Sequence, residues 1–382
     1  MSNIYTNSWL ILDKKQLIHN IKQFKRLIGD EVALIPVIKS NAYGHGIKEV
    51  SKICNQRPEV KKLAVASLDE AIFLQQQGIT KPILTLSFFN LPSKIEKRLL
   101  KRIEFVIYDL NQAKTLNTLA KKYNLKIKIH LKIDTGTSRL GILPNETINF
   151  AKKLKQLANL QTYGIFTHFA TAEEINQNFT LKQIKNFNDL INSLARQNIN
   201  FKERHAACSA AILLQKSSHY DAVRLGLSLY GMYSLENHRE ELKKKYPWFN
   251  IKPVLTWKTK IIQIKKLPKG TSIGYGRTHS LKQVSRIAVL PVGYWDGYDR
   301  KLSNKAQVLI NGVKCPVIGR VCMNLIMVNL KSVKNVKIGD EVVLLGRQKN
   351  SFITTEDLAE KAGTINYEIT TRINPLLTRI IK

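Results

Sequence analysis

The chain has 382 residues, of which 44% are hydrophobic and 23% are charged, and these values exclude a fibrous protein and a chain that is disordered throughout. Its charge is unusual, because 61 Lys and Arg face 28 Asp and Glu and give a formal net charge of +33. A basic excess of this size is typical of proteins that bind nucleic acids or anionic membranes. The basic residues are spread along the chain, however, and the densest run, 243–245, directly follows Glu240 and Glu241. We therefore favour a dispersed surface charge and expect no nucleic-acid partner, with nucleic-acid binding kept as the alternative.

The compartment is predicted from apolar runs and cysteines. No apolar run approaches the ~18 residues of a membrane span, and the N-terminus lacks the basic and apolar segments of a secretory signal. The four cysteines are scattered and form no C-x-x-C pair, which favours a reducing compartment over a disulfide scaffold or a zinc site. We expect a cytoplasmic protein with no metal site and no membrane contact.

The first 230 residues alternate apolar runs of strand length with segments of helical periodicity. In the first helical segment Leu17, Ile21, Phe24 and Ile28 share one face, which is the spacing of an amphipathic helix. Further segments of helix length lie at 69–77, 111–123, 146–158 and 181–197. The strand-length runs number eight and lie at 32–38, 63–66, 83–86, 105–107, 127–133, 163–169, 203–207 and 222–225.

Eight buried strands separated by helices predict a (β/α)8 barrel of the TIM type, because strands covered on both faces are apolar along their whole length. An open doubly wound sheet is the competing architecture. No G-x-G-x-x-G turn follows the first strand, which disfavours that sheet.

The composition changes near residue 240. A polar, charged stretch at 234–247 is typical of a linker, and residues 251–352 alternate apolar and polar with frequent glycines, which predicts short strands and turns. One short helix is expected at 355–362, with a Thr at its cap and Gly363 at its end. The sequence therefore predicts a barrel domain over 1–240 and a β-rich C-terminal domain over 241–382.

Polar side chains stand where the predicted strands end, and in a barrel this is the end that carries active sites. They are Lys39, Lys132, His168, Ser209 and Arg224. An ammonium group at the end of an apolar strand is partly desolvated, which disfavours its charge and yields a nucleophilic amine of the kind that a Schiff base requires. Lys39 is placed in this way, although its stem could equally lie along apolar surface with the ammonium in water. The whole set is hard to explain as solvated surface.

Several segments of the chain, in the same order, closely resemble those of bacterial alanine racemases, which are pyridoxal-phosphate enzymes of fold type III. The segments are Val37–Gly46, His130–Gly136 with Arg139–Gly141, Gly164–Ala170, Gly274–Thr278, Pro291–Tyr298, Gly319–Met323 and Gly363–Glu368. The first matches the segment that attaches the cofactor. Because the motifs are separate, ordered and spread over essentially the whole chain, the match is far stronger than any one of them.

The resemblance implies a two-base reaction that interconverts L-alanine and D-alanine and supplies D-alanine for peptidoglycan. Lys39 would hold pyridoxal 5'-phosphate as a Schiff base and then act as the base on one face of the substrate α-carbon. Tyr275 matches the base on the opposite face and would reach in from the partner subunit of a head-to-tail homodimer. A phenol with an ordinary pKa near ~10 is a poor base at neutral pH, so it needs supporting neighbours, and His168 and Arg224 match these. Taken singly, His168 could be a core histidine and Arg224 a member of a structural ion pair.

The resemblance also implies binding roles. In the family the arginine matching Arg224 faces the pyridine nitrogen; a permanent cation cannot protonate that nitrogen, which suits proton return to the α-carbon over transamination. Arg139 and the partner's Met323 match residues near the substrate carboxylate, Lys132 matches a lysine that is carbamylated in some members, and Tyr294 matches a gate tyrosine on the path of the substrate. Residues matching those that bind the cofactor phosphate are Tyr43, Ser209, Gly226, Leu227 and Tyr367.

The chain departs from the family pattern at a few positions. Asn324 follows Met323 where many members have Asp, Cys208 stands for an Asn, Leu225 for a Pro, and Glu173 for an Asp. None of these positions is Lys39 or Tyr275, so we expect activity to be retained. The electrostatics of the carboxylate pocket stays open at Asn324 and Lys132.

Two other functions stay open. A racemase that prefers serine or accepts several amino acids would differ only in pocket residues. A non-catalytic pyridoxal-phosphate carrier shares the barrel type but lacks a second β domain. Basic amino-acid decarboxylases do combine a barrel with a β domain, but the segments of Tyr275 and Met323 match the racemases better.

Overall fold

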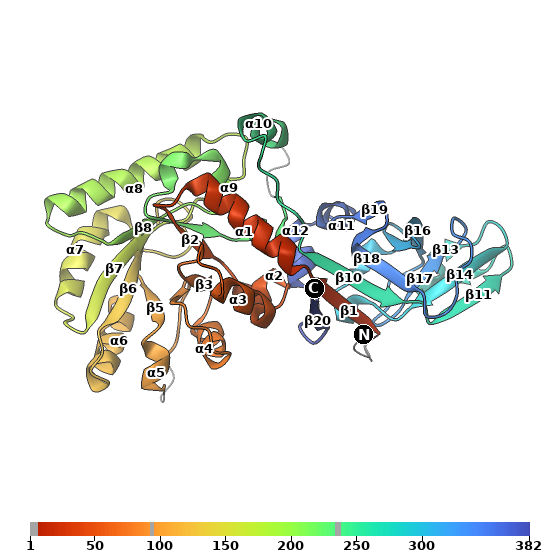
Figure 1. The fold of residues 1–382 in the computed structure, drawn as a ribbon, viewed down its shortest axis with the longest axis horizontal. Helices are drawn as coiled ribbons and strands as arrows, with labels where there is room; N and C mark the ends of the chain where they lie inside the picture. The colour runs from red at the N-terminus through yellow and green to blue at the C-terminus, as the bar shows by residue number, and fades with distance from the viewer. Residues whose placement is uncertain (1–6, 92–94, 234–237) are drawn as a thin grey trace.

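The computed structural model describes residues 7–91, 95–233 and 238–382. A barrel of strands and helices occupies one end of an elongated molecule and a β domain the other (Figure 1). All eight expected barrel strands are present, so the predicted fold class is confirmed. They are β2 (Ala33–Pro36), β3 (Leu63–Val65), β4 (Ile83–Thr85), β5 (Ile103–Ile107), β6 (Ile127–Lys132), β7 (Leu160–Phe166), β8 (Glu203–His205) and β9 (Ala222–Leu225).

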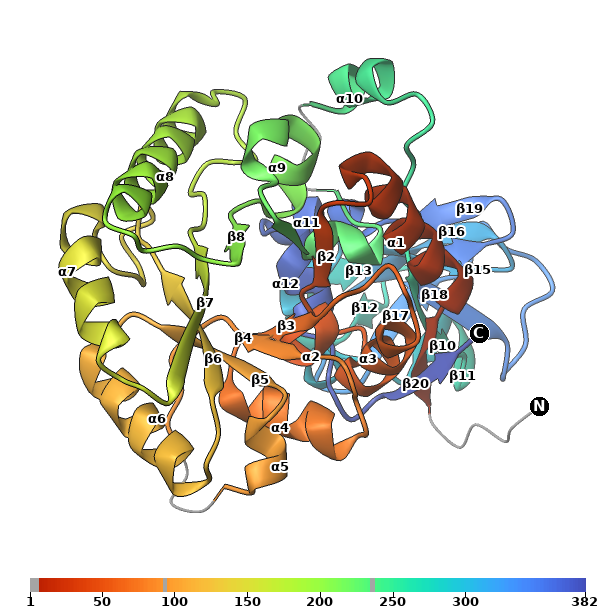
Figure 2. The same ribbon diagram turned by 60° about the vertical axis from the view of Figure 1, so that its left-hand side comes forward.

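The barrel is parallel and nearly closed. Its strands run in the order β2-β9-β8-β7-β6-β5-β4-β3, and a parallel bridge between Val37 and Ala64 joins the two ends of the sheet. Helices surround the strands, as Figure 2 shows for α4 to α8. These helices are α1 (Lys14–Ile28), α3 (Ile47–Asn55), α4 (Leu68–Gln76), α5 (Lys97–Leu100), α6 (Leu110–Lys122), α7 (Pro144–Lys155), α8 (Asn178–Arg196) and α9 (Ser209–Leu214).

Local sequence explains where several of these helices begin. The side chains of Asp13 and Asp109 accept hydrogen bonds from backbone N–H groups in the first turns of α1 and α6. Ser67 and Glu70 form a capping box at α4, in which each side chain satisfies a backbone N–H that the helix itself leaves unpaired. Glu70 also accepts the N–H of Ser40 at 2.6 Å, so the start of α4 is tied to the turn that follows Lys39.

The C-terminal domain is built on a ten-stranded sheet and a separate two-stranded hairpin. Its core contains Trp257, whose indole N–H donates to Ser8 Oγ at 2.7 Å. The strands that follow the barrel are β10 (Leu255–Lys260), β11 (Gln263–Leu267), β12 (Ser272–Ile273), β13 (His279–Ser280), β14 (Ser285–Leu290), β15 (Gln307–Ile310), β16 (Val313–Ile318), β17 (Ile326–Asn329), β18 (Glu341–Gln348), β19 (Ser351–Ile353) and β20 (Thr378–Ile381).

The first strand of the chain lies in this second sheet and not in the barrel. β1 (Ser8–Leu12) pairs antiparallel with β10 and parallel with β20. The expected domain of residues 1–240 is therefore wrong for its first strand, because Leu10 packs in the core of the β domain. The boundary near residue 240 stays a prediction.

The expected linker is partly helical. α10 (Arg239–Lys245) occupies half of the stretch expected to be a linker, with acidic residues in its first turn and lysines in its last, as the helix dipole favours. Residues 234–237 of that stretch lie outside the described residues. The helix expected at 355–362 is confirmed as α11 (Thr355–Ala362), and Thr354 is the residue that caps it.

A further short helix, α12 (Asn366–Thr371), connects the β domain with the barrel. Gly44 approaches Thr370 so closely that a side chain at this glycine would overlap the Thr370 carbonyl oxygen. The hydroxyl of Tyr367 reaches Glu173 in the barrel at 2.8 Å. Among the described residues, no helix is both long enough and apolar enough to cross a membrane.

Candidate active site

A cavity of about 720 Å³ lies at the carboxyl ends of the barrel strands. It brings together most of the residues that the sequence pointed to, from segments as far apart as the turn after β2 and α12. Tyr275, Tyr294 and Met323 do not line it. The expected residues that do are Lys39, Tyr43, Lys132, Arg139, His168, Ser209, Arg224, Gly226, Leu227 and Tyr367.

Lys39 does not end a strand, as the sequence suggested, but begins a turn of unusual conformation. β2 stops at Pro36, and the four residues after Lys39, Ser40–Tyr43, all have positive φ values of 53–55°. This left-handed region costs energy for residues with a Cβ, so neighbouring contacts must hold the turn. Glu70 accepts the N–H of Ser40, and the side chain of Asn41 accepts the N–H of Ile47 at 2.8 Å.

The two lysines that line the cavity, Lys39 and Lys132, have lowered pKa values. Burial lowers the pKa of Lys39, the Arg139 guanidinium lowers it further, and Glu70 opposes them. Burial and the charges of Arg139 and Arg224 lower the pKa of Lys132 to about 8. The Lys132 ammonium donates to the carbonyl oxygen of Leu86 at 3.1 Å. Both amines are therefore more nucleophilic near neutral pH than an exposed lysine.

Arg224 is buried, and its two terminal nitrogens are fully used. Nη1 donates to Nδ1 of His205 at 2.6 Å and to the His205 carbonyl at 3.1 Å. Nη2 donates to the carbonyls of Thr167 and Ala206 at 2.7 and 2.9 Å and lies 3.3 Å from Nδ1 of His168. Within the described part of the chain, the remaining donor, Nε–H, has no hydrogen bond. The structure thus leaves one guanidinium donor for a group bound in the cavity.

His168 lies beside Arg224, two residues beyond the end of β7. Burial and the Arg224 charge hold its pKa well below the usual range, so its ring is neutral. Arginine has no acceptor and its Nη2 lies 3.3 Å from His168 Nδ1, so a proton on Nδ1 would face a donor. This contact therefore favours the lone pair on Nδ1 and the proton on Nε2.

A set of hydroxyl and backbone groups suited to a phosphate surrounds Gly226. Ser209 Oγ accepts the N–H of Gly226 at 3.0 Å and that of Ser228 at 3.3 Å. A Cβ on Gly226 would lie 2.8 Å from the Tyr43 hydroxyl, so only glycine leaves this space open. Hydroxyls and backbone N–H groups in such a concave arrangement bind phosphate groups well.

The carboxylate of Glu173 is a feature of this cavity that the sequence flagged only as a departure. It accepts a hydrogen bond from the hydroxyl of Tyr367 at 2.8 Å. Burial and the nearby Glu173 carboxylate both raise the pKa of Tyr367, so its hydroxyl is protonated. A negative charge therefore lies beside the groups suited to a phosphate.

The three expected residues outside the cavity belong to the exposed surface of the β domain. Tyr275 follows β12 and is 72% exposed, Met323 precedes β17 and is 56% exposed, and Tyr294 is 43% exposed. A group of large, exposed apolar side chains is unusual on a protein surface and indicates a surface that contacts another molecule. Within one chain the structure does not bring these residues to Lys39.

Comparison with known proteins agrees with this architecture. A model of the alanine racemase N-terminal domain matches residues 12–234, and one of the alanine racemase C-terminal domain matches residues 254–381. The chain belongs to the alanine racemase family. The alanine racemase of Halothermothrix orenii is 40% identical over 377 residues, with 98% of this chain and 97% of that protein covered. That of Methanococcus maripaludis is 37% identical over 378 residues, with 97% and 98% covered.

Solved structures give the same result. The alanine racemase of Clostridium difficile 630 superposes with a TM-score of 0.92 at 34% identity, with 100% of this chain and 97% of that one covered. The alanine racemase of Bacillus anthracis with bound L-Ala-P has a TM-score of 0.90 at 33% identity, with 100% and 96% covered. The recognition of the family from its motifs is thus confirmed.

Several residues that support the cavity of this alanine racemase family member were not predicted from the sequence. Glu70 carried a signal, since it occupies the last position of a capping box, but nothing in the sequence told that its carboxylate also holds the turn after Lys39. Ser228 offers a second backbone N–H to Ser209. Thr167 and Ala206 hold Arg224 through carbonyl oxygens, which every residue has, so no side-chain pattern could have revealed them.

Proposed function

We propose that this protein is an alanine racemase that interconverts L-alanine and D-alanine with pyridoxal 5'-phosphate as cofactor. The observation that carries the proposal is one cavity that combines an amine of depressed basicity, Lys39, a group of phosphate-binding character around Gly226, and an arginine donor without a partner, Nε–H of Arg224. Family membership and the full-length likeness to alanine racemases support the assignment.

The residues present fit the cofactor. Lys39 would attach it, and Arg224 would donate through Nε–H to its ring nitrogen. Tyr43, Ser209, Gly226, Leu227 and Tyr367 would hold its phosphate. When bound, pyridoxal phosphate supplies an electron-withdrawing ring that makes the α-proton of an amino acid removable.

The reaction then needs a proton acceptor and a proton donor on opposite faces of the substrate α-carbon. Burial lowers the pKa of Lys39 Nζ, which suits a group that must take up and return a proton. Lys39 serves only one face of the α-carbon, and Tyr275 does not line the cavity of its own chain. We therefore place the hydroxyl of the partner subunit's Tyr275 on the other face. Arg139 would hold the substrate carboxylate together with the partner subunit's Met323, and Tyr294 would control access.

The active unit is therefore a homodimer whose two sites each use both chains. The exposure of Tyr275, Met323 and Tyr294 on the β domain supports this assembly. We further propose that the enzyme works in the cytoplasm and provides D-alanine for peptidoglycan.

The direct test is conversion of L-alanine to D-alanine by the purified protein with saturating pyridoxal phosphate. We expect turnover in both directions, and absence of turnover by fully loaded protein would refute the function. A competition assay with serine would separate an alanine racemase from a broad-specificity one.

Two substitutions test the assignment of the bases. Lys39→Ala should abolish both the borohydride-reducible attachment of the cofactor and nearly all activity. Tyr275→Phe should keep the attachment, and it should slow the exchange of the α-proton of L-alanine with solvent deuterium more than that of D-alanine. Equal slowing of the two exchange reactions would show that the two bases are wrongly assigned.

A further inference from the structure

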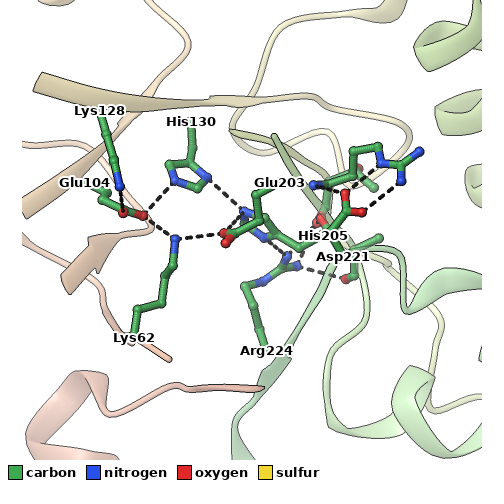
Figure 3. Close-up of polar contacts among 11 residues, drawn as sticks. Lys62, Glu104, Lys128, His130, Glu203, His205, Asp221 and Arg224 are labelled. Carbon is green, nitrogen blue, oxygen red and sulfur yellow. Dashed lines mark hydrogen bonds and ion pairs between the residues drawn. The ribbon is translucent and has the colours of Figure 1, made fainter. Parts of the chain in front are cut away.

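A buried polar network crosses the barrel interior behind Arg224 (Figure 3). Its members come from the barrel strands β5, β6, β8 and β9 and from the residue before β3, and all are buried except Lys128 at its edge. They are Lys62, Glu104, Lys128, His130, Glu203, His205 and Arg224. Nothing in the function proposed above uses the part beyond Arg224.

The hydrogen bonds of this network have a single possible direction. Arg224 can only donate, so Nδ1 of His205, at 2.6 Å from Nη1, must carry a lone pair. The proton of His205 is then on Nε2 and is donated to Nδ1 of His130 at 3.1 Å. The proton of His130 is in turn on Nε2 and is donated to the Glu104 carboxylate at 2.9 Å. A donor-only group at one end and an acceptor-only group at the other thus determine both tautomers.

The charges agree with this direction. Burial, reinforced by the charge of Arg224, holds the pKa of His205 well below its usual range, and burial lowers that of His130, so both rings are neutral. Burial tends to raise the pKa of Glu104, but the His130 hydrogen bond and the Lys62 charge outweigh it and hold the pKa at about 2. A cation and a carboxylate are therefore connected through two neutral imidazoles.

The surrounding residues are shaped to keep the two rings in place. A Cβ at Gly164 would overlap the His130 ring, so the glycine provides the room for this ring. Phe166 stacks on His205 with ring centroids 4.7 Å apart and an interplanar angle of 9°. Side chains held both by packing and by hydrogen bonds have little freedom to reorient.

A metal ion is the other occupant that this cluster could suggest. Ligand atoms of His130, Glu203 and His205 lie within 4.8 Å of one another. Lys62 Nζ, however, is 2.9 Å from Glu203 and also contacts Glu104. The two imidazoles are also hydrogen-bonded to each other. A divalent cation would have to displace the lysine ammonium and break the imidazole contact, so the network favours protons over a metal.

We propose that Glu104 and His130 are positioning residues that act through His205 on Arg224, holding the guanidinium so that its Nε–H points to the cavity. Because His205 is the only side chain that accepts from Nη1 among the described contacts, a carboxylate that polarises its ring strengthens that bond and fixes the rotation of the guanidinium. The inference rests on the proposed function only for the consequence that Arg224 has in catalysis.

The tautomers can be measured directly without an activity assay. In long-range ¹H–¹⁵N spectra of the histidine-labelled protein, we expect His130 and His205 to be neutral Nε2–H tautomers at neutral pH, with His130→Gln and His205→Gln used for assignment. A ring in the Nδ1–H form, or a doubly protonated ring, would overturn the proposal. If a variant fails to fold, through-bond correlation from each ring to the assigned backbone of the wild-type protein identifies the same two rings, so the wild-type spectrum still decides.

A matched pair of variants tests the action on Arg224. Glu104→Gln and Glu203→Gln each remove one buried carboxylate that pairs with Lys62, but only Glu104 accepts from the relay, since Glu203 lies 4.0 Å from Nε2 of His205. With saturating pyridoxal phosphate we expect Glu104→Gln to lower kcat about tenfold with little change in KM, and Glu203→Gln to stay within about twofold of wild type. The visible absorption of the bound cofactor should shift in Glu104→Gln alone.

Equal effects of the two variants on kcat and on the absorption spectrum would reduce Glu104 to a structural ion pair and refute the proposal. The two hypotheses fail separately. A wild-type protein that does not racemise alanine refutes the proposed function, whereas the histidine tautomers and the spectrum of the bound cofactor still report on the relay.

Discussion

At the scale of single residues, the cavity gathers positive charge. Lys39, Lys132, Arg139 and Arg224 all line it. Their mutual repulsion and burial lower the pKa values of both lysines, so the charges that favour an anionic ligand also produce reactive amines. Four of the 61 basic residues thus carry the chemical argument for the cavity.

Lys132 is expected to react with carbon dioxide in a manner that depends on pH. Its pKa of about 8 means that the neutral amine, which is the form that adds to carbon dioxide, becomes the major form above that pH. With ¹³C-labelled bicarbonate we expect a carbamate signal that grows as the pH rises through 8 and is absent from Lys132→Gln. A signal of equal size at pH 6, or one that Lys132→Gln retains, would contradict this prediction.

Glu173 is expected to weaken cofactor binding, because its carboxylate engages the Tyr367 hydroxyl and repels a phosphate. Glu173→Gln should therefore lower the Kd for pyridoxal phosphate by about three- to tenfold, as expected for removing one nearby like charge. Fluorescence titration measures the Kd. Glu146→Gln removes the same charge from an exposed position on α7, outside the cavity, and should leave the Kd unchanged. Identical results for the two variants would show that only the net charge matters.

At the scale of elements, the site depends on the left-handed turn after Lys39 and its contact with α12. The turn is strained by four positive φ values and is held by Glu70 at one end and α12 at the other. Strain of this kind persists where the surrounding structure imposes it. The β domain thus helps to position a lysine that belongs to the barrel.

Gly44→Ala should be far more damaging than Gly78→Ala. Both glycines have φ near +80°, so each alanine meets the same backbone penalty of about 1–2 kcal/mol. At Gly78 nothing lies within 4 Å of the added Cβ, whereas at Gly44 it would overlap the Thr370 carbonyl. Urea unfolding should give a larger loss of unfolding free energy for Gly44→Ala, together with loss of cofactor attachment. Equal losses would mean that the α12 contact yields without cost.

At the scale of the whole molecule, one chain holds two incomplete parts of a racemase site. The cavity contains Lys39 but no second base from the β domain, and Tyr275 lies exposed on that domain. The symmetric dimer proposed above would complete both sites at once, because each interface residue is presented twice.

Mixed dimers provide the test. Lys39→Ala and Tyr275→Ala should each be nearly inactive, yet dimers reassembled from an equal mixture should regain about a quarter of wild-type activity. Half of randomly formed dimers are mixed, and each has one site with both bases intact. Size-exclusion chromatography with light scattering would establish the dimer. Mixtures that remain inactive despite subunit exchange would show that each site uses bases from a single chain.

The barrel and the cavity could be predicted from sequence to a large extent. Buried parallel strands are apolar along their length, so all eight barrel strands were visible as short runs, and the polar residues at their ends converge on one cavity because parallel strands all end at the same side. These features depend on neighbours in the chain and on a topology that short connections enforce. The motifs that identified the family are likewise runs of neighbouring residues, so they can be recognised without the fold.

The tertiary structure alone decided the rest. The pairing of β1 with the second sheet could not be predicted, because its partner, β10, lies about 250 residues away. An apolar strand does not reveal which sheet it completes. Glu104 and His130 had no motif to mark them, and their relay exists only because β5, β6, β8 and β9 bring them to Arg224. Local sequence determined which strands and helices form, and it showed that the carboxyl ends of the barrel strands carry reactive groups. Which long-range pairs meet, and in which protonation state, depended on burial and packing that only the folded chain creates.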